Sequence, residues 1–242
     1  MKDYLYRDLY EEEERHWWHQ AKRKIVLDFI KIYIPNKKLT LIDIGCGTGK
    51  NMETLQQFGQ AWGLDSSTKA IKYCKKRGLS NVILGNAEDT KLAGNKFDLV
   101  TLLDVLEHVD DDKLLKEMSR ILKKNGYLLI TVPALEWMWS QWDVVLHHKR
   151  RYTKKSLISI LQKNKFEIIT ISYMYLFLIL PALVVRMMKK IHNKKEYGSD
   201  FSLSNPFLNK ILSTFAAIER YFIKRGLIPV GLSLIVLAQK KP

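Results

Sequence analysis

The sequence contains little cysteine and lacks the signals of an exported protein. Its 242 residues include two cysteines, Cys46 and Cys74, which are too few for a disulfide framework. No group of cysteine and histidine has the spacing of metal ligands. Residues 1–14 are acidic and lack the basic-then-apolar order of a secretory signal. We therefore expect a cytoplasmic protein without a bound metal ion.

Acidic residues are scarce in the second half of the chain. Residues 133–242 contain 18 Lys and Arg against 6 Asp and Glu, whereas residues 1–132 contain 22 against 19. Most of the formal net charge of +15 therefore belongs to the second half. This asymmetry favours a nucleic acid, an anionic membrane surface or an acidic substrate as the partner, and the sign of the charge does not distinguish them.

Helical and extended patterns alternate from the N-terminus onward. Apolar residues at helical spacing from Trp18 to Phe29 predict a first helix that ends near Pro35. This alternation is typical of an α/β protein with a parallel sheet, and Asn125-Gly126 is expected to close the helix before the fifth strand. Strands are predicted at 39–44, 61–65, 81–85, 97–103, 126–132, 166–172 and 231–239, and further helices at 50–58, 66–77, 110–124 and 153–164.

The clearest sign of a ligand site is a glycine-rich turn in the run Leu-Ile-Asp-Ile-Gly-Cys-Gly-Thr-Gly-Lys. A strand that carries Asp43 and opens through closely spaced glycines lets backbone N–H groups approach a ligand. The dinucleotide fingerprint needs glycine where Lys50 stands, and the phosphate-loop spacing is also absent, so a hydride carrier or a nucleoside triphosphate is disfavoured. A tight turn can also need glycine for packing alone, and this alternative stays open.

Polar residues follow the next two strands as well. Asp65 ends the run Ala-Trp-Gly-Leu-Asp, where a carboxylate can accept hydrogen bonds from both hydroxyls of a ribose. In the run Gly85 to Asp89, a polar side chain and a backbone N–H can contact an adenine edge. Each acidic residue alone could be a helix N-cap. Three such sites at successive strand ends favour a nucleoside ligand.

Five segments together resemble the ordered motifs of class I S-adenosylmethionine-dependent methyltransferases of the small-molecule branch. They are Leu41–Lys50, Gly63–Ser66, Gly85–Glu88, Phe97–Val109 and Leu122–Pro133, and the resemblance covers about residues 39 to 133. It implies a Rossmann-like, doubly wound α/β fold with a seven-stranded sheet, the last strand antiparallel, and S-adenosylmethionine across the strand ends.

The resemblance also implies which residues contact this cofactor. Asp43, Gly45, Cys46, Gly47 and Gly49 would face its methionine part. Asp65 and Ser66 would contact the ribose, Asn86, Ala87 and Glu88 the adenine, and Leu103, Asp104 and Val105 would lie under the methyl group that is transferred.

Two histidines are candidates for a general base, which methyl transfer needs only when the nucleophile is protonated. His108 follows the fourth strand, and the equivalent histidine in the resembling family is often structural. His148 lies beside a basic run and is the better candidate. With His147, Arg150, Arg151 and Tyr152 it could deprotonate an alcohol and bind an anionic group. The alternative is a solvated basic loop.

A subset of bacterial methyltransferases also resembles the chain in His16-Trp17-Trp18-His19. This resemblance implies that the first helix covers the site and that Trp17 and Trp18 contact the acceptor, although both could be ordinary core residues. The expected parts are an N-terminal helical lid at 1–38, a methyltransferase core at 39–172 and 231–242, and a helical insertion at 173–230.

The insertion has the composition of an interfacial anchor. Tyr173 to Val185 carries no charge and is too short to span a bilayer comfortably. Residues 186–225 contain nine Lys and Arg against three Asp and Glu, and helical spacing from Leu208 to Phe222 gives an apolar face bordered by basic residues. This pattern fits peripheral attachment to an anionic membrane at its inner face. Packing on the core or in a dimer interface is the alternative.

These features predict an S-adenosylmethionine-dependent methyltransferase that acts on oxygen in a small hydrophobic or lipid-linked acceptor. An RNA methyltransferase is an alternative, but the (Asp/Asn/Ser)-Pro-Pro-aromatic motif of many amino-group methyltransferases is absent, and nucleic acid is not the expected partner. A non-catalytic binding protein of the same fold is disfavoured because the glycine turn and Asp65 are intact. The sequence does not predict the oligomeric state.

Overall fold

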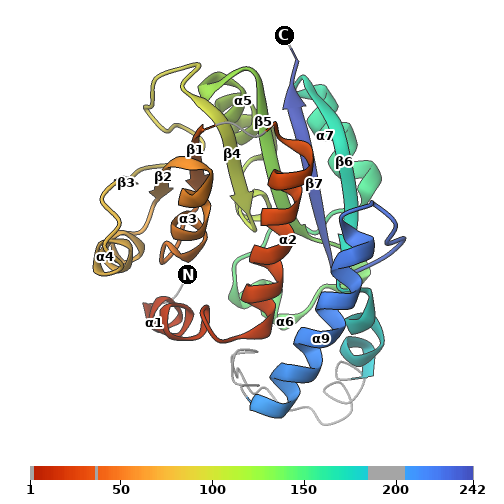
Figure 1. Ribbon diagram of the computed structural model, residues 1–242. Coiled ribbons are helices and arrows are strands. Elements are labelled where there is room, and N and C mark those ends of the chain that lie inside the picture. Colours follow the sequence, from red (N-terminus) through yellow and green to blue (C-terminus); the bar gives the residue numbers. More distant parts are fainter. Residues whose placement is uncertain (1–2, 36–37, 185–204, 242) are drawn as a thin grey trace.

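A single mixed sheet organises the described part of the protein (Figure 1). The computed structural model describes residues 3–35, 38–184 and 205–241. The sheet has the order β3-β2-β1-β4-β5-β7-β6, in which β7 runs antiparallel to both of its neighbours. The predicted Rossmann-like fold with an antiparallel last strand is therefore confirmed. The strands are β1 Leu39–Ile44, β2 Gly59–Asp65, β3 Val82–Leu84, β4 Phe97–Leu103, β5 Leu122–Pro133, β6 Phe166–Met174 and β7 Ser233–Lys240.

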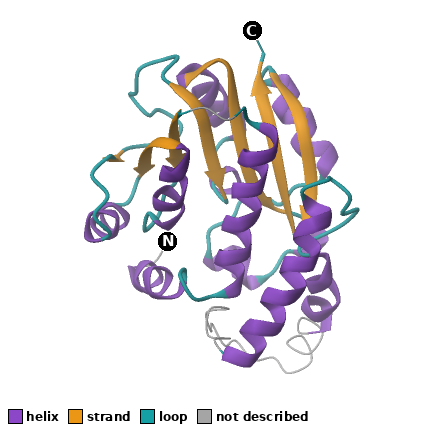
Figure 2. Ribbon diagram, viewed as in Figure 1, coloured by secondary structure: helices purple, strands orange, loops and turns teal. Residues whose placement is uncertain are grey.

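Helices cover both faces of this sheet (Figure 2). One layer contains α2, α3 and α9, and α5 and α7 pack on the opposite face. The helices are α1 Asp3–Glu12, α2 Trp17–Tyr33, α3 Lys50–Leu55, α4 Thr68–Lys76, α5 Asp111–Ile121, α6 Gln141–Val145, α7 Lys154–Lys163 and α9 Pro206–Ile223.

The core lies along the central strands. The apolar residues of β1, β4 and β5 are buried on both faces, as the near-continuous runs of Leu, Ile and Val predict for parallel strands between two helical layers. β7 has the same character, with Leu234 to Ala238 fully buried. This rigid core fixes the position of the strand ends at which the site is built.

The N-terminal segment forms two helices where one was predicted. α1 ends at Glu12 and α2 begins at Trp17, with His16 as its N-cap. The His16 Nδ1 atom accepts a hydrogen bond from the Trp18 backbone N–H at 3.3 Å, which satisfies a free donor of the first turn. Glu13, between the two helices, bonds Thr48 and Arg77 across the chain. These long-range contacts favour the break.

The fifth strand starts earlier than predicted. α5 ends at Ile121, and β5 begins at Leu122, which pairs with Phe97 of β4. Asn125-Gly126 therefore lies inside the strand and does not close the helix. Asn125 has a φ of 59°, and the register between β4 and β5 shifts between Phe97 and Leu99, so this pair forms an irregularity of the strand.

The insertion is helical in its described parts. Its predicted first residue, Tyr173, belongs to β6, and a 3₁₀ turn at Leu176–Leu178 follows the strand. Residues 185–204, which include the basic positions from Arg186 to Lys195, lie outside the described residues. Within the described ranges, no helix combines the length and the apolarity needed to cross a bilayer.

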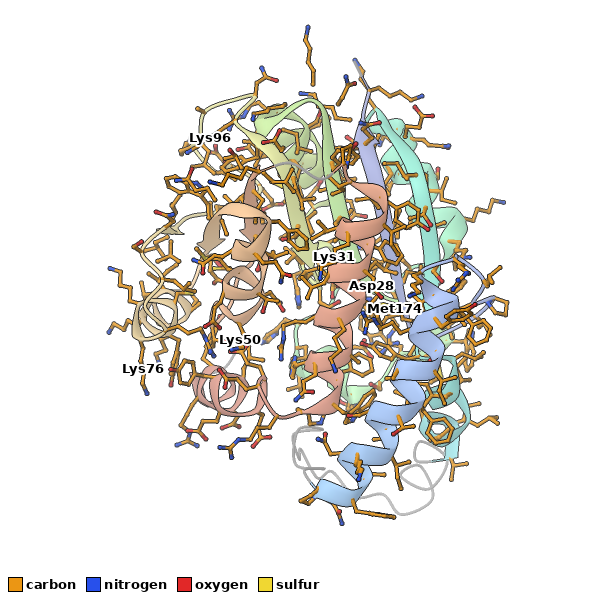
Figure 3. All side chains as sticks on the ribbon, in the orientation of Figure 1. Asp28, Lys31, Lys50, Lys76, Lys96 and Met174 are labelled. Carbon is orange, nitrogen blue, oxygen red and sulfur yellow. The ribbon has the colours of Figure 1, made fainter. Side chains whose placement is uncertain are left out.

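Helix α9 is joined to α2 by polar contacts along its length. Arg220 donates to both carboxylate oxygens of Asp28, which is labelled in Figure 3, at 2.6 Å each. At one end, the Asn209 side chain accepts from the Trp17 backbone N–H at 2.8 Å. At the other end, the Tyr33 hydroxyl donates to the Lys224 carbonyl at 2.7 Å. α9 is thus fixed against the sheet by α2.

Candidate cofactor and acceptor site

The candidate site lies at the carboxyl ends of β1, β2 and β4. These ends face the same way, and α1, the start of α2, and α6 lie beyond them (Figure 1). In open α/β sheets, ligands bind outside the carboxyl ends of the strands, where the strand order reverses. Here the strand order reverses between β1 and β4, so this rule predicts a ligand at the carboxyl ends of these two strands.

The three glycines of the turn serve different purposes. All have positive φ, of 71° at Gly45, 55° at Gly47 and 89° at Gly49. A Cβ atom at Gly45 would lie 2.5 Å from Val105, and one at Gly49 would lie 2.5 Å from Leu79, so both glycines are needed for packing. A Cβ at Gly47 would meet only Leu9 of α1, at 3.7 Å. Of the three glycines, Gly47 is therefore the one whose Cβ position is not crowded by the surrounding fold.

The backbone donors of this turn bond within the fold, which corrects one expectation. The N–H groups of Gly45 and Cys46 both donate to the Leu64 carbonyl, at 2.7 and 3.1 Å. The Gly47 N–H donates to the Asp65 Oδ2 atom at 2.9 Å, and the Gly49 N–H to the Cys46 carbonyl at 3.0 Å. Any approach to a ligand at these four residues must therefore use the Cα atoms and carbonyls.

Asp43 is a buried carboxylate with one open oxygen. Its Oδ1 atom accepts a hydrogen bond from the Thr101 hydroxyl at 2.6 Å, while Oδ2 has no partner among the described residues. Burial raises the pKa of Asp43 to about 7, with a smaller contribution from the Asp65 carboxylate. An open, buried carboxylate oxygen suits a cationic ligand group, such as the ammonium or sulfonium of S-adenosylmethionine.

Asp65 ends β2 and keeps spare acceptor capacity. Its two oxygens accept from the Gly47 and Ser67 backbone N–H groups, at 2.9 Å each, which orients the carboxylate. An ionised carboxylate has about four lone-pair sites, so two remain for ribose hydroxyls. Ser66 is exposed, and Ser67 rather than Ser66 contacts Asp65 and caps α4.

The turn after β3 is held by its own polar groups. The Asn86 side chain accepts from the Glu88 backbone N–H at 2.9 Å, and the Glu88 carboxylate accepts from the Asp110 N–H at 2.9 Å. The half-buried Ala87 packs against the core between them. These hydrogen bonds fix the conformation of the turn. One of its backbone N–H groups, that of Glu88, already has a partner and is not free to contact adenine. Together with Asp43, Asp65 and the uncrowded Gly47, this arrangement fits S-adenosylmethionine.

The end of β4 is occupied by an ion pair. Leu103 and Val105 are buried, and Asp104 between them has a φ of 59°. The Asp104 carboxylate pairs with the Lys22 ammonium of α2 and accepts from the Thr131 hydroxyl at 2.8 Å. Burial alone would raise the pKa of Asp104, but the Lys22 ammonium and the Thr131 hydrogen bond together lower that pKa. Lys22 was not predicted as a site residue.

His148 is oriented by a fully buried carboxylate, Asp143 of α6. Its Nδ1 atom lies 2.9 Å from the Asp143 Oδ1 atom, and the Arg151 guanidinium donates to both oxygens of Asp143, at 2.8 and 2.9 Å. Although burial opposes it, hydrogen bonds from His148 and Arg151 hold the pKa of Asp143 well below its usual range. Because an ionised carboxylate only accepts hydrogen bonds, Nδ1 carries the proton and Nε2 is left as a base.

Glu107 and His108 lie on the other side of this histidine. The Nε2 atom of His148 is 3.9 Å from Glu107, and the two histidine rings are 4.9 Å apart. Burial raises the pKa of Glu107 well above its ordinary value, and burial lowers that of His108. Glu107, His108 and His148 each offer one ligand atom within 4.8 Å of the others, so the fold brings together a possible metal-ligand set that sequence spacing does not reveal.

The basic run after His148 is bound within the fold, which corrects its predicted role. Arg151 is paired with Asp143, and Arg150 forms an ion pair with Asp111 at 2.6 Å. The buried Tyr152 hydroxyl donates to the same Asp111 carboxylate at 2.9 Å. The guanidinium forks therefore have internal carboxylate partners in place of an anionic acceptor, while His147 has an exposed side chain.

The two tryptophans differ in their environment. Trp17 is buried in the core, as the alternative interpretation expected. Trp18 is half-buried, and its ring stacks on Tyr175 with 3.9 Å between ring centroids. Tyr175 follows β6 and was not predicted as a site residue.

Comparisons with known proteins agree with this geometry. A family described as "Methyltransferase domain" matches residues 42–130. A "Ubiquinone biosynthesis O-methyltransferase" of Pelagibacter ubique (strain HTCC1062) is 31% identical over 172 residues, which are 61% of this chain and 70% of that protein. The chain belongs to the class I S-adenosylmethionine-dependent methyltransferases. This methyltransferase spans a third to about 60% of the length of several other curated relatives.

Two solved structures share the fold of the methyltransferase. A "SAM dependent methyltransferase" from Archaeoglobus fulgidus is 20% identical with a TM-score of 0.58, covering 90% of this chain and 94% of its own. A Haemonchus contortus "Phosphoethanolamine N-methyltransferase 2 in complex with S-adenosyl-L-methionine" is 19% identical with a TM-score of 0.57, covering 90% and 52%. As a member of its family, the methyltransferase is an enzyme whose cofactor is S-adenosylmethionine.

Proposed function

We propose that this methyltransferase transfers a methyl group to an oxygen atom of a small hydrophobic or lipid-linked acceptor. The observation that carries the proposal is the His148–Asp143 pair beside the end of β4. Bound S-adenosylmethionine supplies an electrophilic methyl group at that end. An alcohol or phenol oxygen holds a proton that must leave, and His148 Nε2 is the base that the Asp143 hydrogen bond makes available.

The curated relatives support oxygen as the accepting atom. The Pelagibacter ubique protein carries the name "Ubiquinone biosynthesis O-methyltransferase", and so does a relative from Bartonella tribocorum that is 29% identical over 135 residues. On this proposal, Asp43, Gly45, Cys46, Gly47 and Gly49 hold the methionine part, Asp65 and Ser66 the ribose, Asn86, Ala87 and Glu88 the adenine, and Leu103, Asp104 and Val105 the methyl end.

The N-terminal segment is proposed to close over the cofactor. Glu13 bonds the Thr48 hydroxyl and the Arg77 guanidinium, and Glu14 pairs with Arg77 at 2.8 Å and with Lys50 at 2.9 Å. These contacts fix the end of α1 above the glycine turn. On the acceptor side, the half-buried Trp18 and the exposed His147 are proposed contacts.

We further propose that the exposed face of α9 attaches the enzyme to an anionic membrane. Aromatic and aliphatic side chains on this face and in the following loop are exposed, and Lys210, Lys224 and Arg225 border them. Such a face combines apolar insertion with attraction to anionic headgroups. The exposed apolar residues are Phe207, Phe215, Ile218, Tyr221, Phe222 and Leu227.

Untargeted methyl-label transfer tests the acceptor class. Labelled S-adenosylmethionine is incubated with lipid, small-molecule and RNA extracts, with wild-type enzyme and with the His148→Asn variant in parallel. We expect label in the lipid or small-molecule fraction with wild-type enzyme and much less with the variant. Label in RNA that persists after removal of lipid would contradict the proposal and favour an RNA methyltransferase.

A further inference from the structure

The hydroxyl of Tyr175 is a buried polar group without a hydrogen-bond partner among the described residues. Tyr175 directly follows β6 and is 1% exposed. A buried hydroxyl without a partner costs free energy, and such groups persist where a ligand or a water satisfies them. The atom is therefore a candidate contact for a molecule that the site binds.

The backbone at Tyr175 is held in an unfavourable conformation. Its φ and ψ are 66° and 44°, in the left-handed region that a bulky residue rarely adopts. The next residue, Leu176, donates its backbone N–H to the Glu219 Oε1 atom at 2.8 Å. Glu219 lies on α9 and is itself buried, at 7% exposed. Strained conformations of this kind persist where the surroundings fix them, and they gather at functional sites.

Contacts from α2 connect Tyr175 with the end of β4. The Trp18 ring stacks on the Tyr175 ring, and the Trp17 ring meets its edge at 5.9 Å between centroids. Lys22 follows Trp18 by one helical turn, so both project from the same face of α2, and Lys22 pairs with Asp104. Through Trp18 and Lys22, the same face of α2 therefore contacts both Tyr175 and Asp104 at the end of β4, under the proposed methyl position.

The electrostatic environment keeps this hydroxyl protonated. Burial raises the pKa of Tyr175 well above its ordinary value, and the carboxylates of Asp104 and Glu219 raise it further. A phenol that stays protonated is a permanent hydrogen-bond donor. It suits an oxygen atom, which accepts strongly, better than a sulfur atom, which accepts weakly.

We propose that Tyr175 is a catalytic residue whose hydroxyl donates a hydrogen bond to the reacting oxygen of the acceptor, with Glu219 as its positioning residue. This inference rests on the proposed O-methylation. As the new oxygen–carbon bond forms, the carbon–sulfur bond of the sulfonium breaks, S-adenosylhomocysteine leaves, and the acceptor proton passes to His148 Nε2. Tyr175 keeps its own proton. Its hydrogen bond favours the deprotonated oxygen and fixes its direction toward the methyl group.

The test compares an oxygen and a sulfur nucleophile of the same shape. Methyl transfer to 4-butylphenol and to 4-butylthiophenol is measured with wild-type enzyme and with Tyr175→Phe. We expect kcat/KM for the phenol to fall about tenfold or more in the variant, because the donor is lost, and that for the thiophenol to change less than about twofold. The affinity for S-adenosylhomocysteine and the melting temperature of the ligand-free protein should not fall, because no internal hydrogen bond is removed.

Glu219 offers a second pair of variants. Glu219→Gln keeps an oxygen that accepts from the Leu176 N–H and should preserve the phenol-to-thiophenol ratio of wild type. Glu219→Leu removes that acceptor and should shift the ratio toward sulfur in the folded fraction. Equal loss of both activities in Glu219→Leu would show a structural role alone.

The outcomes separate this inference from the proposed function. If wild-type enzyme methylates the phenol and Tyr175→Phe keeps the same ratio, Tyr175 does not bind the reacting oxygen. If Tyr175→Phe lowers the melting temperature and both activities together, the hydroxyl is a structural group. If wild-type enzyme transfers methyl to the thiophenol alone, the proposed O-methylation fails, and this inference fails with it. If wild-type enzyme methylates neither the phenol nor the thiophenol, the proposed O-methylation and the role of Tyr175 are both contradicted.

Discussion

The proposed cofactor half and the proposed acceptor half of the site are built from different kinds of sequence. On the cofactor side, Asp43, the glycine turn and Asp65 lie within 23 residues of sequence and at the ends of two adjacent strands. On the acceptor side, Lys22, Asp143, Tyr175 and Glu219 come from four distant segments. Substitutions in the cofactor half should therefore disturb the structure only locally. The acceptor half depends on how α2, α6 and α9 pack together.

The largest effect is expected at the center of the cofactor half, at Gly47. Gly47→Val places a branched side chain at a φ of 55° and directs it toward Leu9 of α1. We expect cofactor binding to be abolished, measured as loss of the increase in melting temperature that S-adenosylhomocysteine gives.

Gly78→Val is the matched control for Gly47→Val. Gly78 has a φ of 81°, and a Cβ there would meet no atom within 4 Å, so the substitution adds backbone strain without placing a side chain in the glycine turn. It should lower the melting temperature and retain the cofactor-induced increase. Equal cofactor protection in both variants would mean that the glycine turn serves packing alone.

On the acceptor side, the largest effect is expected at His148. His148→Asn removes the base and should lower turnover about a hundredfold on an oxygen acceptor, with cofactor affinity nearly unchanged. His108→Asn is the comparison, because the His108 ring lies beside His148 but has a backbone carbonyl, not a carboxylate, near its Nδ1 atom. Full activity of His148→Asn from pH 6 to 9 would show that the base is elsewhere or is not needed.

Asp65→Ala should weaken cofactor binding at least tenfold. Two charge-assisted hydrogen bonds to ribose hydroxyls are lost, each worth roughly 1.5–3 kcal/mol. The same carboxylate also accepts from the Gly47 and Ser67 N–H groups, so the melting temperature should fall as well. Calorimetry with S-adenosylhomocysteine measures the affinity. An unchanged affinity in a folded Asp65→Ala protein would remove Asp65 from the ribose site.

Much of the fold and of the cofactor half was predictable, because both follow from local patterns. Alternating apolar segments predicted the seven strands, and the acidic residues at the strand ends indicated the edge of the sheet at which we propose that the cofactor binds. The break at His16 was not predictable, since it depends on Glu13 reaching Thr48 and Arg77 in other elements. Tyr175 gave no signal in the sequence, because its neighbours Trp18 and Glu219 meet it only after α2 and α9 pack.

Cofactor affinity should depend on pH through Asp43. Its pKa is raised to about 7 in the ligand-free protein, and a cationic ligand group favours the deprotonated form. The affinity for S-adenosylhomocysteine should therefore rise about tenfold from pH 6 to pH 8, with proton release on binding below pH 7. Asp43→Asn should bind weakly with no such dependence. A wild-type affinity that is independent of pH would place the cationic group away from Asp43.

The raised pKa of Asp43 also makes the stability of the folded protein depend on pH. The folded protein holds this proton up to about pH 7, whereas the unfolded chain releases it near pH 4. The folded state is therefore favoured by this group below pH 4, and the advantage is lost as the pH rises to 7. Relative to Asp43→Asn, the ligand-free wild-type protein should lose stability over this range, which urea titrations at several pH values measure.

The smallest effects are expected on the exposed face of α9. Ile218→Ser with Phe222→Ser should remove the binding to anionic liposomes that survives high salt, while Lys210→Glu with Lys224→Glu should remove mainly the salt-sensitive part. Ile218 and Phe222 are chosen because Phe215 stacks on Phe177, and its replacement would disturb the fold. If the intact protein does not bind anionic vesicles at low salt, the face is a packing or dimerisation surface.

Identification of the atom that receives the methyl group tests the account most directly. An isotope-labelled methyl group is transferred from S-adenosylmethionine to the natural acceptor, and the product is analysed by NMR and mass spectrometry. Wild-type enzyme should give a methyl ether in an organic-soluble product, with at least tenfold less from Asp65→Ala and about a hundredfold less from His148→Asn. A methyl group on nitrogen, or on RNA, would contradict the proposed function and leave the His148–Asp143 pair without its catalytic role.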